Sequence, residues 1–455
     1  MSVTDLSYAG QQPNSSIRQV MSAADERILT LDVLRGLAVF GIFVRNIFLF
    51  AMPTSAFVLP AAWSEGSFAN FTSWWTVEIF FDGSMRAIFS MLFGASALII
   101  LAKCESEPQG FSQVERYYRR LVMLMGLGLI HAYLLLWPND VLFFYGVFGL
   151  LLFPLRNLPT KHLFLGASMV MLFFAALQVQ NSLPELELPV VAAESFSDAP
   201  VQTEDPAEAQ NAQDVGEQLT ALLHSSWQEE EETRRSGYLV NFRESSSLAI
   251  EQHTTELMTN HLFDIGAMLL LGMALFKCGF LSGKLSSLAY FVVLVVGYGL
   301  GISMKVAALD GWYQALLPEP YSQWDWGTIN FDLSRLAIAL AHLSTLILAL
   351  RLRVLSRLAK LLAASGRLAL TNYLTQTLFG AFVFYGFGLG WFGQFDHAQI
   401  LALAVLFGVT QIIMSNIYLR YFQRGPFEYL LHIFVYTGAL RLGQQTDHPA
   451  GALRK

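Results

Sequence analysis

Residues 31–52 read LDVLRGLAVFGIFVRNIFLFAM, an apolar run long enough to cross the hydrocarbon core of a bilayer as a helix. Asp32 and Arg35 lie at its head, although a charge at membrane depth costs at least about 2.5–3.5 kcal/mol. Asn46 follows Arg35 by three helical turns plus about 20°. The three polar side chains therefore fall within about 60° on one face, which must look into protein or into a water-filled cavity. The stretch predicts a membrane helix beside a polar site.

The composition extends this prediction to the whole chain of 455 residues. It is 54% hydrophobic and 14% charged, with a mean hydropathy of +0.46, which is typical of multi-pass membrane proteins and excludes a soluble enzyme. We predict an all-α, polytopic integral membrane helical bundle with about ten transmembrane helices. Residues 427–441 are too short to span and are interpreted as a re-entrant or interfacial helix, so nine or eleven crossings stay open. The predicted spans are 31–52, 80–102, 121–137, 141–157, 161–180, 262–282, 286–306, 330–351, 366–390 and 398–420.

The distribution of basic residues predicts the orientation. With a cytoplasmic N-terminus, twenty of the 28 Lys and Arg residues lie on the cytoplasmic side, including the clusters at 116–120 and 351–360. Both termini are then cytoplasmic. The polar residues 1–30 show no cleavable signal peptide. Cys104 and Cys278 both fall on the cytoplasmic side, so we expect no disulfide, and no Cys/His spacing indicates a metal site.

One long polar segment divides the chain into two membrane halves. Residues 181–232 hold 13 acidic and no basic residues, which predicts a flexible extracytoplasmic loop. Residues 236–257 have the pattern of an amphipathic helix lying on the outer membrane face. The expected organisation is a tail (1–30), a first half with five helices (31–180), the acidic loop with its amphipathic helix (181–260), a second half (261–442) and a tail (443–455).

His131 is the leading candidate for catalysis. It lies in the third predicted span, past the midplane toward the outside, and an imidazole can take a proton from a hydroxyl nucleophile at neutral pH. A buried interhelical hydrogen bond is the alternative interpretation. Asp140 follows the Pro138-Asn139 turn, where it can orient the imidazole or cap the next helix.

Further intramembrane polar residues are candidates for substrate binding. Arg35 can pair with Asp32 or offer its planar guanidinium to a phosphate or carboxylate. Arg86 and Arg335 each have an acidic residue one turn earlier, Asp82 and Asp332, so simple charge neutralisation competes with a substrate role. Arg45 points about 80° away from Arg35 and should serve a different neighbour.

The ninth predicted span carries a polar cluster that includes Asn372 and Gln376. Interhelical hydrogen bonds and the lining of a substrate path are both open interpretations. The Gly-rich end of this span lacks the context of a phosphate-binding loop, so we expect no nucleotide there. The cytoplasmic basic clusters follow from topology, and they can also bind anionic lipid or the phosphates of a CoA-type donor.

Several motifs together resemble the YeiB-like family of bacterial multi-pass membrane proteins (domain-of-unknown-function family 418). They follow one another along nearly the whole chain, and the last two are the most specific. The matching stretches are RILTLDVLRGLAVFGIFVRNI (27–47), FDGSMRAIFSMLFGAS (81–96), YRRLVMLMGLGLIHAYLLLWPNDVLFFYGVFGLLL (118–152), SGYLVNFR (236–243), LLLGMALFKCGFLSG (269–283), GRLALTNYLTQTLFGAFVFYGFGLGWFG (366–393) and RGPFEYLLHIFVY (424–436).

The first helix and the general plan are also similar to a wider superfamily of membrane acyltransferases, which includes the lysosomal heparan-α-glucosaminide N-acetyltransferase. In those enzymes a cytoplasmic acyl-CoA donates its acyl group through a helix bundle to a sugar on the far side. The resemblance implies an acyl-CoA-type cosubstrate, no bound cofactor, and a glycan or lipid-linked acceptor. The acetyltransferase uses a histidine in its first outer loop. This sequence has none there, so the base must come from elsewhere.

We therefore expect a bacterial inner-membrane acyltransferase that moves an acyl group from a cytoplasmic acyl-CoA-type donor to an extracytoplasmic hydroxyl or amine. His131 would act as the base, and Arg35 and Asn46 would position the donor. Two other classes stay open: a transporter or exporter of a small polar or anionic solute, and a non-catalytic interaction protein that docks through its acidic loop. Membrane lipid is an expected partner and nucleic acid is not, while the oligomeric state is left open.

Overall fold

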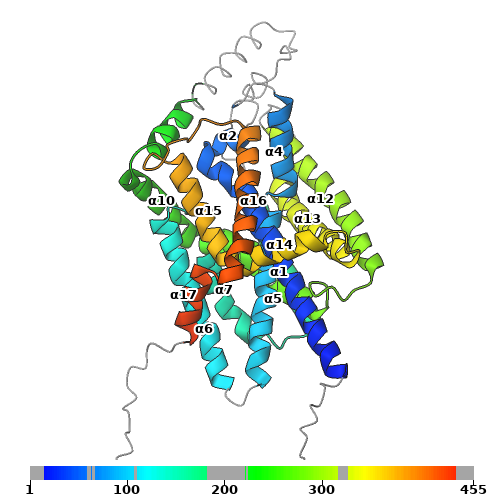
Figure 1. Cartoon of the computed structure of the whole chain (residues 1–455). Helices are drawn as coiled ribbons and strands as arrows, with labels where there is room; N and C mark the ends of the chain where they lie inside the picture. The colour runs from blue at the N-terminus through cyan, green and yellow to red at the C-terminus, as the bar shows by residue number, and fades with distance from the viewer. Residues whose placement is uncertain are drawn as a thin grey trace, which may run out of the picture.

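The computed structural model of the chain describes residues 15–58, 63, 67–106, 110–181, 221, 224–315 and 326–436. Within these ranges the ordered elements are helices, joined by short turns, and no strand occurs (Figure 1). The predicted all-α class is therefore confirmed. The acidic part of the predicted loop and both chain ends lie outside the described residues.

The first half of the bundle contains α1 to α8. Helix α1 contains residues 31–51 of the predicted span 31–52 and begins earlier, at Ser15. The elements of the first half are α1 (Ser15–Ala51), α2 (Thr54–Val58), α4 (Phe68–Phe80), α5 (Ser84–Ser106), α6 (Gly110–Leu129), the π-helix η1 (Ile130–Leu134), α7 (Leu142–Leu155) and α8 (Thr160–Asn181).

The second part of the described chain begins with the segment predicted to be an amphipathic helix and ends on a short helix. Its elements are α10 (Tyr238–His253), the π-helix η4 (Leu257–Gly266), α11 (Ala267–Lys277), α12 (Ser287–Ala315), α13 (Trp326–Arg351), α14 (Ser356–Arg367), α15 (Ala369–Phe384), α16 (His397–Tyr421) and α17 (Pro426–Tyr436). At 11 residues α17 is too short to cross a bilayer, and it packs against α6 and α15.

Six stretches of the described chain are long and apolar enough to span a membrane, and two shorter apolar helices accompany them. The prediction of about ten crossings is therefore not confirmed, although each predicted span falls on a helix or on two consecutive helices. The long stretches are Leu29–Ala51, Phe68–Leu101, Asn260–Lys277, Ser287–Ala307, Asp332–Arg351 and His397–Tyr421, and the shorter helices are Leu142–Leu155 and Thr160–Ala176.

Backbone breaks explain why some predicted spans divide. Gly83, with a φ of 71°, makes the turn between α4 and α5, in the left-handed region that only glycine enters without strain. Leu136 has a φ of 61° just after η1, so the predicted span 121–137 ends in an irregular turn before Pro138. The predicted span 366–390 begins inside α14, and Leu368 separates that helix from α15.

Glycines let the central helices approach backbone to backbone. A Cβ added at Gly366 of α14 would lie 1.8 Å from the carbonyl oxygen of Asp32 on α1, and one at Gly36 would lie 2.1 Å from that of Leu362. Gly94 of α5 faces Leu269 of α11 equally closely, an approach that small residues allow between membrane helices. These contacts fix α14 against α1 at the level of the Asp32–Arg35 pair.

The described ends of the helices fall into two groups (Figure 1). The start of α1, the end of α5, the start of α6 and the end of α17 lie at the lower end of the bundle in this view. Helix α2, the start of α4 and the connection from α15 to α16 lie at the upper end. The lower group contains the segments that the Lys/Arg distribution predicts to be cytoplasmic.

Candidate functional site

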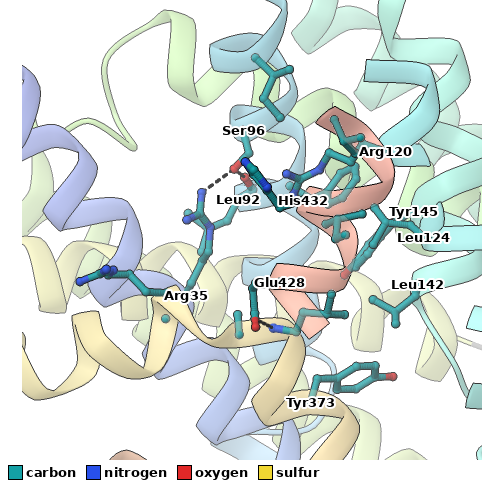
Figure 2. A pocket seen from close by; sticks show the side chains of 18 of the residues that line it. Arg35, Leu92, Ser96, Arg120, Leu124, Leu142, Tyr145, Tyr373, Glu428 and His432 are labelled. Atoms are coloured by element: carbon teal, nitrogen blue, oxygen red, sulfur yellow. Dashed lines mark hydrogen bonds between the residues drawn. The ribbon is translucent and has the colours of Figure 1, made fainter. Parts of the chain in front are cut away.

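A cavity of about 490 Å³ opens among α1, α5, α6, α7, α17 and the junction of α14 with α15. It is lined on the inside mainly by apolar and aromatic side chains. Figure 2 shows Ser96 and Arg120 at one end of this view and Leu142 and Tyr373 at the other. The cavity therefore has a basic region and an apolar inner end, the combination that binding of an amphiphilic anion requires.

Five arginines line the basic region: Arg35, Arg116, Arg120, Arg367 and Arg424. Four of them belong to the side that the sequence predicts to be cytoplasmic, and Arg35 lies near the start of the first predicted span. Among the described residues, only Arg35 of this set forms an ion pair, at 2.7 Å from Asp32, and its other terminal nitrogen donates to Ser96 Oγ at 2.7 Å. The pairing of Asp32 with Arg35 is thus confirmed. The guanidinium groups of the other four have no carboxylate partner within the described chain.

Among the described residues, Glu428 of α17 is the carboxylate that lines the cavity, and it accepts hydrogen bonds from the backbone of α15. Its Oε1 accepts the N–H groups of Leu370 and Thr371 at 2.8 and 3.0 Å, and its Oε2 accepts the Thr371 hydroxyl. These N–H groups are free donors in the first turn of α15, where the helix dipole also favours a negative charge. Because α15 holds Glu428, the arginines keep an excess of positive charge.

His131 lies directly behind the inner end of the cavity. Its ring and that of Tyr373, which lines the cavity, are 4.8 Å apart between centroids. Its Nδ1 lies 2.7 Å from Asp140 Oδ1, and its Nε2 lies 2.7 Å from Thr377 Oγ1 on α15. Asp140 also accepts the backbone N–H of Phe143 at 2.8 Å, so it orients the imidazole and caps α7 at once. The catalytic roles of His131 and Asp140 stay predictions.

The other intramembrane charges form a separate network, and one predicted pairing is wrong. Asp82 does not neutralise Arg86. It lies 2.7 Å from Arg45 of α1 and 3.2 Å from the buried Lys305 of α12, because the turn at Gly83 directs it toward those helices. The separate neighbour predicted for Arg45 is therefore Asp82. Lys305 is 1% exposed and also pairs with Glu78.

Arg86 and Arg335 meet at a carboxylate that the sequence did not suggest. Asp264 of η4 lies 3.0 Å from Arg86 and also pairs with Arg335, while Arg335 keeps its predicted partner Asp332 at 2.9 Å. Neither arginine lines the cavity. Their charges are neutralised, and their roles in substrate binding stay predictions.

The predicted polar cluster of α15 ties helices together. Asn372 donates to Ser365 of α14 and to Ser415 of α16, and Gln376 donates to the Val39 carbonyl of α1 and to Gln411 of α16. This is the interhelical interpretation of the cluster. Asn372, Gln376 and Asn46 do not line the cavity, and their roles in substrate binding stay predictions.

Sequence reasoning missed Arg367, Arg424, Glu428, His432 and Thr377. The first four stand in or beside the motifs 366–393 and 424–436, so the motifs carried a signal that hydropathy did not. Thr377 also lies within the motif 366–393, but nothing distinguishes it there, because a threonine on an apolar helix is ordinary.

Apolar spans joined by buried ion pairs define the class: the chain is a multi-pass helical membrane protein. Residues 275–438 match a family described as a protein of unknown function (DUF418). The chain is 29% identical to "Uncharacterized protein YeiB" of Escherichia coli (strain K12) over 428 residues, which cover 89% of this chain and 95% of that protein.

A second relative is "Uncharacterized protein YxaH" of Bacillus subtilis (strain 168), 27% identical over 438 residues, which cover 93% of this chain and 97% of that protein. No solved structure gives a significant match. The chain is thus similar to YeiB-like proteins over most of its length and to the DUF418 family over residues 275–438, in agreement with the resemblance of its motifs. The names of these relatives assign no activity.

Proposed function

We propose that the protein is an acyltransferase of the bacterial inner membrane, with both termini cytoplasmic. It takes an acyl group from an acyl-CoA-type thioester on the cytoplasmic side and delivers it to a hydroxyl or amine on the other side. The single observation that carries the proposal is the cavity, with four arginines free of ion pairs within the described chain at one end and an apolar inner end beside His131.

The chemistry of the donor fits the two ends of the cavity. The nucleotide part of CoA carries several phosphate charges, and guanidinium groups bind phosphates through paired, charge-assisted hydrogen bonds. Arg35, Arg120 and Arg367 would hold this part. The acyl chain would enter the apolar end, where Leu142 and Tyr373 lie. The thioester would then approach the wall that separates the cavity from His131.

His131 would supply the proton transfer that acyl transfer requires. A neutral imidazole that donates Nδ1–H to Asp140 has a free electron pair on Nε2, and Asp140 stabilises the imidazolium that forms on proton uptake. The absence of a histidine from the first outer loop is consistent with a base on the third predicted span.

The first test is ligand-induced stabilisation of detergent-solubilised protein. Palmitoyl-CoA, acetyl-CoA and free CoA are compared with palmitate, because a ligand that binds only the folded state adds about 2.7 kcal/mol at one hundred times its Kd. We expect stabilisation by the CoA compounds, and less of it at high salt. Arg120→Gln should weaken this effect. Arg119→Gln is the matched control, since Arg119 lies on the same helix, pairs with Glu115 and does not line the cavity.

The second test is thioester consumption. Purified protein should release free thiol from an acyl-CoA in the presence of a membrane extract that supplies acceptors, and His131→Gln should reduce the rate by about 10²-fold or more. Binding without thiol release by the wild-type protein, or full release by the His131 variant, would contradict the proposal.

A transporter of a small polar or anionic solute is the second candidate, and the buried ion network favours it. Arg45, Asp82, Lys305 and Glu78 connect α1, α4 and α12 in the membrane interior, where ionisable groups mark substrate or ion pathways. Flux of an anionic solute into proteoliposomes without thioester consumption would support this function and exclude acyl transfer.

A further inference from the structure

Three buried side chains form one hydrogen-bonded line: His131 and Asp140, which are close in sequence, and Thr377, which is 246 residues from His131. Asp140 Oδ1 lies 2.7 Å from His131 Nδ1, and His131 Nε2 lies 2.7 Å from Thr377 Oγ1. None of the three is more than 2% exposed. The order carboxylate, imidazole, hydroxyl is that of the Ser-His-Asp triad, in which the hydroxyl is the nucleophile.

The hydrogen bonds that Asp140 accepts determine which atoms of His131 and Thr377 act as donors. Asp140 accepts the Phe143 N–H with its other oxygen and therefore stays in place as an acceptor for His131 Nδ1–H. With that proton on Nδ1, Nε2 is the acceptor and Thr377 donates its hydroxyl proton to it. This is the direction in which a base activates a hydroxyl.

The hydroxyl of Thr377 is used differently from those of comparable threonines. On the same helix Thr375 donates to the carbonyl four residues earlier, as do Thr345 on α13 and Thr410 on α16. That bond satisfies a helical threonine locally. Thr377 donates to the imidazole instead, although it stands on the same kind of apolar helix. The Thr377 hydroxyl is thus hydrogen-bonded to His131 and not to the backbone of its own helix.

Helix α15, which carries Thr377, and helix α7, which follows Asp140, also line the inner end of the cavity. Helix α15 contributes Tyr373, one turn before Thr377, and α7, which follows Asp140, contributes Leu142 and Tyr145. Tyr373 contacts both the cavity and the His131 ring. Tyr373 therefore links the cavity wall to the imidazole that holds Thr377.

We propose that Thr377 is the catalytic nucleophile and carries the acyl group as an ester between donor and acceptor. This inference rests on the proposed function and adds a covalent intermediate to it. Thr377 Oγ attacks the thioester carbonyl while His131 Nε2 takes the hydroxyl proton. The C–S bond breaks, and the thiolate leaves with that proton.

The second step reverses the first with a new partner. The acceptor hydroxyl or amine gives its proton to His131 and attacks the ester carbonyl. A bond from the acceptor to the acyl carbon forms, the bond to Thr377 Oγ breaks, and the oxygen regains a proton from His131. The donor and acceptor therefore never need to occupy the site together, which suits substrates on opposite sides of a membrane.

The test is mass spectrometry of the full-length, detergent-solubilised protein after incubation with acetyl-CoA or palmitoyl-CoA and no acceptor. We expect a mass increase of one acyl group, removed by hydroxylamine and mapped to the peptide that contains Thr377. Thr377→Ser should keep the adduct, and Thr377→Val should lose it together with about 10²-fold or more of the thiol release. Thr410→Val is the matched control, because its hydroxyl bonds only to Leu406 in the described chain.

The outcomes separate this inference from the proposed function. Thiol release that persists in Thr377→Val, or an adduct on another residue, would overturn the role of Thr377 and leave acyl transfer in place. Failure of the wild-type protein to release thiol in the presence of acceptors would overturn both. Since Thr377→Ser keeps the hydroxyl and Thr377→Val keeps the shape, equal unfolding temperatures show that neither result reflects misfolding.

Discussion

Glu428, at the start of α17, caps the N-terminus of α15 by accepting the backbone N–H of Leu370 at 2.8 Å. The contact joins two short helices that together form one side of the cavity. Glu428→Ala would leave N–H groups of the first turn without this acceptor, which costs about 1–3 kcal/mol. We expect a lower free energy of unfolding in a denaturant titration and, because the only carboxylate lining the described cavity is gone, tighter binding of CoA.

Glu428→Ala should thus lower the free energy of unfolding while it tightens CoA binding, and this combination makes the prediction specific. Glu115→Gln, which breaks the exposed pair with Arg119, is the control and should change stability by at most about 0.5 kcal/mol. A Glu428 variant with unchanged stability, or with weaker CoA binding, would contradict the assignment of this carboxylate to the helix terminus.

The contact of Gly366 with α1 predicts a second, purely steric effect. A Cβ at this position would lie 1.8 Å from the Asp32 carbonyl oxygen, and backbone cannot move aside as a flexible side chain can. Gly366→Ala should therefore separate α14 from α1 and destabilise the fold by about 1–3 kcal/mol or more. Gly299→Ala on α12 should have little effect, since nothing lies within 4 Å of the added atom. Monodispersity and unfolding temperature measure both variants.

Whether a contact can be predicted from the sequence depends on how far apart its two residues lie along the chain. Asp32–Arg35 and Arg335–Asp332 are one turn apart on single helices, so helical spacing was sufficient to predict them. Asp140 is separated from His131 by a short turn, and that pairing was also a named alternative. In all three cases the partner is local.

Contacts between distant helices were not predictable in the same way. Thr377, Asp264 and Glu428 reach their partners through the packing of helices that are distant in sequence. This packing cannot be predicted from apolar residues alone, because a helix face that contacts lipid and one that contacts protein have similar sequences. The pairing of Asp82 failed for a related reason. Spacing alone placed Arg86 within reach, whereas the left-handed turn at Gly83 directs Asp82 toward α1 and α12.

The Asp82 network predicts a large stability effect. Asp82→Asn leaves Arg45 and Lys305 with one carboxylate fewer in a buried site, which costs about 3–5 kcal/mol. The double variant Asp82→Asn, Lys305→Met should recover part of this loss, because it also removes one of the two cations. Equilibrium unfolding of the wild type, both single variants and the double variant gives the coupling energy. Additive single effects would show that the two residues do not interact.

The burial of His253, at the end of α10, predicts how the stability of the protein depends on pH. Burial against Phe143 and Phe144 lowers its pKa below the ordinary 6.5, and the Asp140 carboxylate offsets only part of that effect. Between the two pKa values the unfolded chain binds more protons than the folded protein. The free energy of unfolding should therefore decrease as the pH falls below about 6.5 and level off below the lowered pKa.

His253→Gln should make this pH dependence shallower, because the variant has no imidazole to protonate at that position. His162→Gln, a change at an exposed histidine, is the control for a general effect of removing one imidazole. The measurement is the unfolding midpoint of detergent-solubilised protein at several pH values between about 5 and 7.5. A His253 variant whose stability falls with pH as steeply as that of the wild type would show that another group, and not this histidine, takes up the proton.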